Sequence, residues 1–368
     1  MRTIRRTGRA IDLPLLLITL ALMGIGIVTL FSITHADPHP LYKKQILWMA
    51  LGMCGLIVAA ITDYSIYTRF SRHLYIANLI LLMLALLAAH KTNGASRWIR
   101  IAGFEFQPSE TAKLIVILTL GAFLTDRRET IRSGKTFLLS LFYVIIPTLL
   151  IFKQPDLGTA LVVITIWAIM MFIAGANIRH LIMLLLGGIL LLVIAWHSNK
   201  LLKPYQKQRL ITFINPQADT AGSGYHVTQA RIAIGSGRVF GKGLLHSTQV
   251  KRGYIPEKQT DFVFTDIGEE LGFVGGTLVT LLYAGLLLRG YQIIAAADQD
   301  LYAKLIGTGI VAMIAFHVIV NIGMNIGILP VAGVPLPLIS SGGSNVIVTL
   351  YCIGLLESVS IHHKQMIF

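Results

Sequence analysis

The sequence predicts an all-α, polytopic integral membrane protein, and two observations carry this prediction. Of the 368 residues, 55% are hydrophobic and only 13% are charged, whereas a soluble domain carries about 25% charged residues. The mean hydropathy is +0.72, and apolar runs long enough to cross roughly 30 Å of hydrocarbon recur along the chain. This composition excludes an ordinary soluble enzyme and a disordered chain.

Ten apolar runs define the expected transmembrane helices. They cover residues 12–34, 45–62, 73–90, 110–125, 137–152, 157–174, 179–197, 262–288, 303–329 and 338–361. The first run is too long for the apolar core of a signal peptide, so we expect it to remain as an anchor. We expect residues 1–368 to form a single transmembrane domain.

Lys and Arg residues in the connections predict the orientation. The side that carries both termini holds fourteen of them, and the short connections of the other side hold six. The positive-inside rule therefore predicts a multi-pass protein of the cytoplasmic (inner) membrane with both termini in the cytoplasm.

A large extracytoplasmic loop, about residues 198–261, is expected between helices 7 and 8. It holds ten Lys and Arg residues against three acidic residues. Loops of this length in compact folds are usually functional. We interpret it as a structured basic loop that meets anionic lipid or phosphate rather than nucleic acid. The alternative is a solvated tether without a ligand.

Charged residues at the outer ends of the fourth and sixth runs are candidates for a site. Glu110 and Lys113 are three positions apart, so their side chains share a helix face and can pair. A capping role is the alternative for Glu110, and reaching the interface is the alternative for Lys113. An ionisable side chain at membrane depth nevertheless marks a functional candidate. Asp156 opens the sixth run, where we expect helix capping rather than catalysis.

Further carboxylates begin the eighth run. Asp261 closes the long loop, and a helix cap and a general base explain its position equally well. Glu269 and Glu270 lie about two helical turns farther along and could pair with Lys113 or with each other.

An uncharged segment rich in Pro and Gly, residues 328–344, joins the ninth run to the last one and overlaps the start of the latter. Main chain freed from helices at membrane depth must be buried in protein or line a cavity, so we expect a re-entrant or broken segment. Asn321 in the preceding run is interpreted as a contact between helices rather than a ligand. The histidines show no metal-ligand spacing, both cysteines lie in apolar runs, and the absence of a P-loop argues against ATP.

An ordered set of motifs resembles the shape, elongation, division and sporulation (SEDS) family. The motifs are residues 107–110, 154–158, 222–230, 234–237, 241–243, 256–264, 268–272 and 335–344. Each is weak alone, but together they run in order over nearly the whole chain. Gly-Tyr-His at 224–226, His-Ser-Thr-Gln at 246–249 and Asn-Ile-Gly-Met at 321–324 resemble the RodA-type elongation branch more than the FtsW-type division branch.

The sequence departs from the family pattern at two positions. Asp266 stands where a small or apolar residue is expected, and Ser341 stands where an aromatic residue is common in the elongation branch. An extra carboxylate near Asp261 could perturb the ionisation of that residue.

The resemblance implies a peptidoglycan glycosyltransferase that polymerises lipid II at the outer face of the membrane during cell elongation. It implies that Asp261 is the essential carboxylate, and that Glu110 and Lys113 form a polar pair in the adjacent cavity. It also implies a class B penicillin-binding protein as the transpeptidase partner, within a complex of elongation membrane proteins.

In this mechanism Asp261 takes the proton of the acceptor hydroxyl, and cations stabilise the departing undecaprenyl pyrophosphate. The predicted substrate-binding or cavity residues are Glu110, Lys113, Arg97, Arg100, Asp156, Arg209, Arg231, Lys242, Glu269, Glu270 and Ser344. No metal ligand is predicted, although a divalent cation, Mg or Mn, is compatible with this chemistry. A lipid II flippase is the alternative function, and a non-catalytic scaffold is a third.

Overall fold

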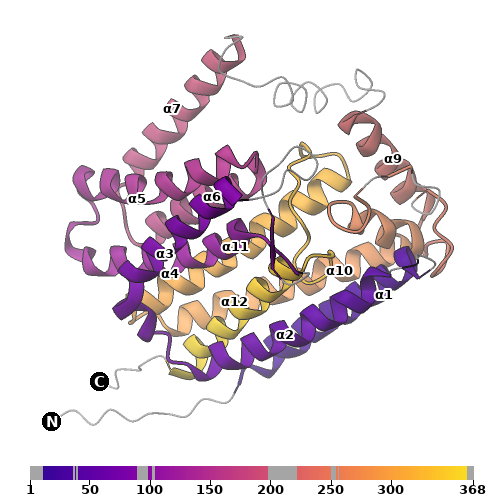
Figure 1. The fold of residues 1–368 in the computed structure, drawn as a ribbon, viewed down its shortest axis with the longest axis horizontal. Coiled ribbons are helices and arrows are strands. Elements are labelled where there is room, and N and C mark those ends of the chain that lie inside the picture. The colour runs from indigo at the N-terminus through magenta and orange to yellow at the C-terminus, as the bar shows by residue number, and fades with distance from the viewer. Residues whose placement is uncertain are drawn as a thin grey trace.

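The computed structural model describes residues 11–362 except 36–37, 39, 89–97, 102–103, 198–221, 250–253 and 256. Its helices are α1 (Leu13–Thr34), α2 (Leu41–Ile61), α3 (Ile66–Ala88), α4 (Pro108–Asp126), α5 (Gly134–Lys153), α6 (Leu157–Ile173), α7 (Ile178–His197), α9 (Ser223–Ser236), α10 (Val263–Ala296), α11 (Leu301–Asn325) and α12 (Gly343–His362). A 3-10 turn, η1 (Arg128–Thr130), follows α4. The strands β1 (Ile99–Ile101) and β2 (Phe104–Phe106) form an antiparallel hairpin (Figure 1).

The predicted fold class is confirmed, since each of the ten apolar runs coincides with a helix. Within the described residues, eight helices are long and apolar enough to cross a membrane, and α6 and part of α7 are shorter apolar helices. The hairpin β1–β2 was not predicted from the sequence, because three-residue strands leave no hydropathy signal.

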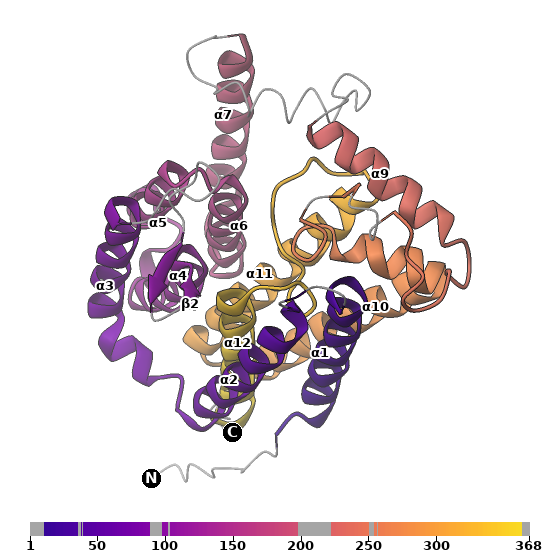
Figure 2. The same cartoon turned by 45° about the vertical axis from the view of Figure 1, so that its right-hand side comes forward.

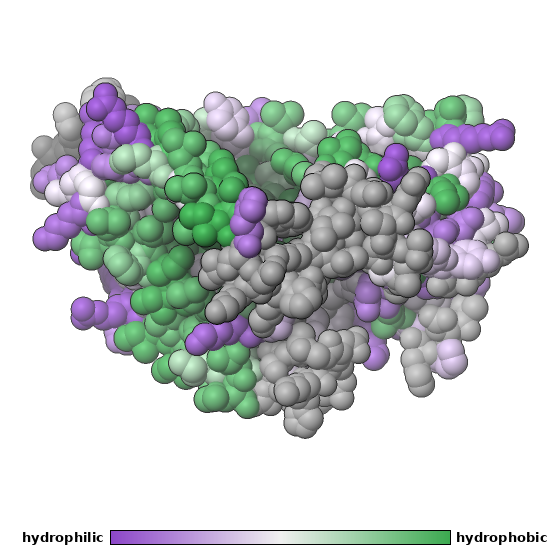
Figure 3. All heavy atoms as spheres, turned by 90° about the horizontal axis from the view of Figure 1, so that it is seen from above, coloured by the Kyte–Doolittle hydropathy of each residue, from purple (hydrophilic) through white to green (hydrophobic). Residues whose placement is uncertain are grey.

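Helix α12 lies at the centre of the bundle, where it contacts α2, α4, α10 and α11. The two views in Figures 1 and 2 show α1 and α2 on one side of this centre and α3, α4, α5 and α6 on the other. In both views α7 projects from the rest, and α9 packs beside α10. Figure 3 shows a face on which apolar side chains form a broad area, while hydrophilic ones gather mainly toward its two ends. This distribution suits a protein surrounded by lipid.

Helices α2, α4, α6, α10 and α12 all begin at the same end of the bundle, here called the Asp261 end. At the opposite end, the residue before α1 contacts α10 through an ion pair and α12 through a hydrogen bond. Asp12 pairs with Arg289 at 2.6 Å, and its main-chain N–H donates to Glu357 at 2.8 Å. The start of α1 and the ends of α10 and α12 therefore lie together.

Helix α10 is broken at Gly272, which adopts φ 66° and ψ −159°. Residues 238–243 pair with residues 269–274 through four main-chain hydrogen bonds of 2.9–3.1 Å. A Cβ atom on Gly241 would lie 2.1 Å from the Glu270 carbonyl oxygen, so only glycine permits this approach. The sequence predicted an uninterrupted run here; the structure differs because a loop supplies the hydrogen bonds that the broken helix lacks.

The expectation of a non-helical segment before the last helix is also confirmed. Between α11 and α12 the chain has no helix from Gly327 to Gly342. Gln45 of α2 holds the end of this segment, because its side chain donates to the Ser340 carbonyl and accepts from the Gly342 N–H. Tyr283 of α10 donates to the Pro337 carbonyl. The second half of the segment, from Val334 to Ser340, is thus mostly buried against helices, whereas Ile328 is exposed.

Candidate functional site

Side chains at the Asp261 end connect the starts of three helices. The Gln107 side chain, just before α4, donates to the Asp156 carboxylate at the start of α6 (3.1 Å). The Gln107 main-chain N–H donates to the Ser344 hydroxyl at the start of α12 (3.0 Å). The start of α6 also touches the non-helical segment, because a Cβ on Gly158 would lie 2.6 Å from the Ala332 carbonyl oxygen.

Asp261 lies two residues before α10, whose N-cap is Phe262, and is half-buried. Its main-chain carbonyl accepts hydrogen bonds from the side-chain amides of Asn321 and Asn325 in α11, each at 3.0 Å. Beside its carboxylate lies Gly333 of the non-helical segment, where an added Cβ would be 3.6 Å from Asp261 Oδ2. Asp261 is therefore placed between α11 and the non-helical segment, at the end where the helices α4, α6, α10 and α12 begin.

Glu110 and Lys113 pair as predicted, but deep inside the bundle. Lys113 Nζ lies 2.9 and 2.8 Å from the two Glu110 carboxylate oxygens and 2.9 Å from His317 Nε2. The other ring nitrogen of His317 contacts the Met313 carbonyl, so Nδ1 carries the proton and Nε2 accepts from Lys113. Asn345 Nδ2 donates to Glu110 at 2.8 Å. The ammonium group thus uses all three of its protons.

The exposed fractions of Glu110, Lys113 and His317 are 3%, 1% and 2%. Lys113 does not extend to the membrane interface, so the alternative of a lysine that reaches the interface is wrong. A buried charge costs several kcal/mol unless it is paired, and here the pairing is complete.

Asp156 is a helix cap, as the sequence predicted. Its carboxylate accepts from the Thr159 N–H at 3.2 Å and the Thr159 hydroxyl at 2.9 Å, and from the Ser109 hydroxyl at 3.1 Å. The same carboxylate therefore caps α6 and joins it to α4.

Glu269 and Glu270 pair neither with Lys113 nor with each other, which corrects the expectation from the sequence. Glu269 accepts from Lys242 Nζ at 2.6 Å and from three groups of Thr248 and Gln249. Glu270 accepts from the Ser32 hydroxyl of α1 at 2.6 Å and from the main-chain N–H at position 247. The break at Gly272 causes the difference, because the loop packed there brings its own partners.

The basic residues predicted to bind substrate lie in different surroundings. Lys242 is bound to Glu269. Arg231 of α9 is exposed, and its Cδ would lie 2.8 Å from a Cβ placed on Gly327 at the end of α11. Arg97 and Arg209 lie outside the described residues. Only the main chain of Arg100 is described, and it belongs to β1, where it pairs with Glu105 of β2.

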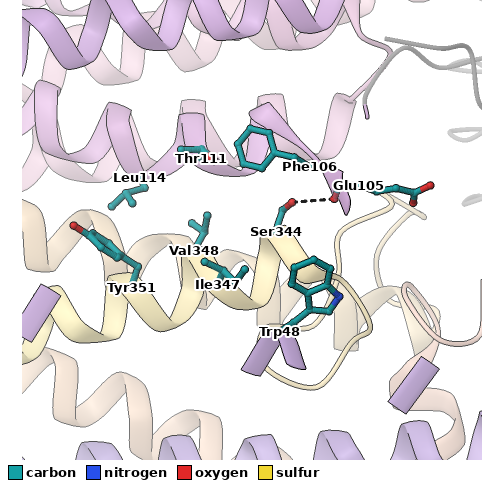
Figure 4. A pocket seen from close by; sticks show the side chains of 9 residues that line it. All are labelled: Trp48, Glu105, Phe106, Thr111, Leu114, Ser344, Ile347, Val348 and Tyr351. Atoms are coloured by element: carbon teal, nitrogen blue, oxygen red, sulfur yellow. Dashed lines mark hydrogen bonds between the residues drawn. The ribbon is translucent and has the colours of Figure 1, made fainter. Parts of the chain in front are cut away.

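An apolar pocket of about 260 Å³ opens beside Ser344. It is lined by Trp48, Glu105, Phe106, Thr111, Leu114, Ser344, Ile347, Val348 and Tyr351, which come from α2, β2, α4 and α12. Figure 4 shows Ser344 and Glu105 at one end of it and Tyr351 at the other. The Ser344 hydroxyl lies 3.4 Å from the Glu105 carbonyl oxygen. Such a pocket suits an apolar chain whose polar end points toward the helix starts.

The sequence did not single out three of the residues that complete these clusters. His317 lies in the ninth apolar run, and Asn325 and Asn345 lie at helix ends. A signal was present, because a polar residue inside an apolar run usually contacts another helix, but the partner cannot be read from the run. Among the residues that the structure describes, no three His, Cys, Asp or Glu side chains form a cluster suited to a metal ion.

A scan against protein families matches residues 12–365 to the model FTSW_RODA_SPOVE, described as "Cell cycle protein". "Stage V sporulation protein E" of Bacillus subtilis is 38% identical over 359 residues, covering 95% of this chain and 96% of that protein. "Peptidoglycan glycosyltransferase MrdB" of Escherichia coli K12 is 37% identical over 361 residues, covering 97% and 95%.

Solved structures resemble the chain over nearly its full length. A chain from a study titled "Structural coordination of polymerization and crosslinking by a peptidoglycan synthase complex" has a TM-score of 0.82 at 32% identity, covering 95% of this chain and 98% of that one. The rod shape determining protein RodA of Thermus thermophilus has a TM-score of 0.72 at 30% identity, covering 97% and 99%.

Proposed function

Because this chain belongs to the FtsW, RodA and SpoVE family, the SEDS family, we propose that it is a peptidoglycan glycosyltransferase. In this proposal it polymerises lipid II into glycan strands at the outer face of the cytoplasmic membrane, with both termini in the cytoplasm. The motifs that resemble the elongation branch, and the similarity to a rod shape determining protein, support a role in cell elongation.

The observation that carries the proposal is the position of Asp261. Its carboxylate lies beside Gly333, at the end of the bundle where α4, α6, α10 and α12 begin. Each helix start bears a partial positive charge, so several of them together favour a pyrophosphate. A carboxylate next to such a region suits a general base whose substrate carries a pyrophosphate.

In the proposed reaction Asp261 accepts the proton of the acceptor GlcNAc 4-hydroxyl. The oxygen forms a bond to the anomeric carbon of the donor MurNAc, whose bond to the pyrophosphate oxygen breaks. Undecaprenyl pyrophosphate leaves with the electron pair. The helix starts and the cationic side chains of the loop stabilise its charge, and a positioned base contributes roughly 10²- to 10⁴-fold in rate.

The apolar pocket supports the same substrate class. It opens at Ser344, and Ser344 is joined to Gln107 at the helix starts. We infer that the first isoprene units of an undecaprenyl chain lie in it, with the pyrophosphate toward Asp261, because a pocket of about 260 Å³ is too small for the whole chain. A divalent cation, Mg or Mn, would supply positive charge for the departing pyrophosphate. In the part of the chain that the structure describes, no cluster of His, Cys, Asp or Glu side chains would hold it.

A class B penicillin-binding protein is the proposed partner, together with other elongation-complex proteins of the membrane. A peptidoglycan synthase complex that couples polymerisation with crosslinking contains a chain with this fold, which supports such an assembly. Polymerised strands would then pass to the transpeptidase of the partner.

The test is polymerisation of labelled lipid II by the purified protein with its partner, comparing the wild type with Asp261→Asn. This substitution keeps the size of the side chain and removes the base. We expect glycan chains to disappear while the melting temperature and partner binding are retained. Chains made at the wild-type rate would contradict the proposal and leave the flippase and the scaffold as explanations.

A further inference from the structure

The main chain of Asp261 is fixed by two asparagines that lie one turn apart on α11. Asn321 and Asn325 are both fully buried. Their side-chain nitrogens each lie 3.0 Å from the Asp261 carbonyl oxygen. The carbonyl therefore receives two amide donors, which use both of its lone pairs.

Each of the two amides also uses its second N–H. Asn321 Nδ2 donates to the Val334 carbonyl at 2.8 Å, and Asn325 Nδ2 donates to the Asn321 carbonyl at 2.8 Å. A buried amide donor without a partner costs roughly 1–3 kcal/mol. The amides are satisfied only while the Asp261 carbonyl stays in place, so they resist any shift of this residue.

Asn321 joins the two sides of the site. Its amide donates one hydrogen bond to the Asp261 carbonyl and the other to the Val334 carbonyl. Val334 follows Gly333, and Gly333 is the residue that lies beside the Asp261 carboxylate. A single planar amide thereby sets the spacing between the main chain of Asp261 and the non-helical segment. Loss of Asn325 would release only one of these two sides.

Thr265 fixes the orientation of the second amide. Its hydroxyl donates to Asn325 Oδ1 at 2.6 Å, so the nitrogen of that amide faces Asp261. Thr265 is itself buried in the first turn of α10. The contacts thus run from Thr265 in α10 to Asn325 in α11 and back to Asp261, two residues before α10 begins.

We propose that Asn321 and Asn325 are positioning residues for Asp261, that Asn321 is the more important of them, and that Thr265 acts through Asn325. This proposal rests on the proposed function, in which Asp261 is the general base. The asparagines bind the main-chain carbonyl of Asp261 and thereby hold its carboxylate at the place where the acceptor hydroxyl arrives. A displacement of about 1 Å can cost up to about 100-fold in rate.

The test compares kcat, KM for lipid II and melting temperature of the complex with its partner for Asn321→Leu, Asn325→Leu and Thr265→Val. Each substitution removes hydrogen-bonding groups at similar volume. We expect kcat to fall by roughly 10- to 100-fold for Asn321→Leu, less for Asn325→Leu and least for Thr265→Val, with KM within about twofold. Asn321→Gln keeps both donors but moves them by one methylene, so an intermediate kcat and an unchanged fold are expected.

Asn78 of α3 provides the matched control. It is fully buried, and neither of its amide atoms has a hydrogen-bond partner in the part of the chain that the structure describes. Asn78→Leu should leave kcat unchanged. An equal loss of kcat in Asn78→Leu and Asn321→Leu would overturn the proposal, because it would show a general effect of losing a buried amide.

Asp261→Asn measured in parallel separates the two proposals. If Asp261→Asn is inactive while all three α11 and α10 variants keep the wild-type kcat, the positioning proposal is wrong and the proposed function stands. If Asp261→Asn polymerises normally, both fail. If the variants lower the melting temperature but keep the wild-type kcat in their folded fraction, these residues only stabilise the fold and the positioning proposal is wrong.

Discussion

Glu110 and Asp261 are two carboxylates near the same end of the bundle, yet the fold holds them in opposite ways. The Glu110 carboxylate itself receives Lys113 and Asn345, and the side chain is buried. Asp261 is held through its main-chain carbonyl by Asn321 and Asn325, and its side chain is half-buried.

Under the proposed function, this contrast separates a structural charge from a chemical one. Donors on the Glu110 carboxylate cancel its charge inside the bundle, where an unpaired charge would be costly. Amides on the Asp261 main chain fix the position of the residue without using the oxygens that a general base needs. We therefore expect substitutions of the first cluster to affect mainly stability, and those of Asp261 to affect mainly activity.

The largest expected effect on stability comes from Lys113→Met. It leaves the Glu110 carboxylate buried without its cation, which costs about 3–5 kcal/mol. The double variant Lys113→Met with Glu110→Gln removes both charges and should lose clearly less. Denaturant or thermal unfolding in detergent measures both variants. If Lys113→Met alone were as stable as the wild type, the ion pair would not be needed for stability. If Lys113→Met kept full polymerisation activity, Lys113 would not belong to the functional site.

A smaller effect is expected for Lys242→Met. Its partner Glu269 keeps three other hydrogen bonds, from Thr248 and Gln249, and the Lys242 side chain is 25% exposed. The substitution removes the charge-assisted hydrogen bond to Glu269 and an exposed one to the Thr248 hydroxyl, at a cost of about 1.5–2 kcal/mol. The same unfolding measurement applies. A loss as large as that of Lys113→Met would indicate that the loop bonds around Glu269 depend on the lysine.

Asp156→Ala should cost at least about 1 kcal/mol, since it removes the cap of α6 and the acceptor of the buried Ser109 hydroxyl. Polymerisation should continue, because Asp156 accepts its hydrogen bonds from neighbouring helix starts. The activity assay and an unfolding curve check this together. A folded but inactive Asp156→Ala protein would contradict this prediction and indicate that Asp156 takes part in catalysis.

The smallest change in stability is expected for Asp261→Asn, within about 0.5 kcal/mol. The bonds from Asn321 and Asn325 reach the main chain and remain in the variant. The same preparation of Asp261→Asn should have lost polymerisation activity. The variant would then keep the stability of the wild type without its activity. A lowered melting temperature would mean that the carboxylate has a structural role as well.

Much of the site could be predicted from residue types. Asp156 lies at a predicted helix start and is a cap, and Glu110 and Lys113 share a helix face and pair. These outcomes depend on residues three or four positions apart, whose geometry the helix itself fixes. The wrong expectation for Glu269 had a different origin. Its partner Lys242 lies 27 residues away, and it meets Glu269 only because α10 breaks at Gly272.

The sequence by itself determined the ten apolar helices, the end of the bundle at which the carboxylates gather, and the family. Hydropathy sums over about 20 neighbouring residues, so it needs no knowledge of the fold. Only the tertiary structure decided that His317 receives Lys113 from 204 positions away and that Asn321 holds Asp261 from 60 positions away. A hydrogen bond depends on a few tenths of an ångström between such residues, and only the packing of α4, α10 and α11 sets that distance.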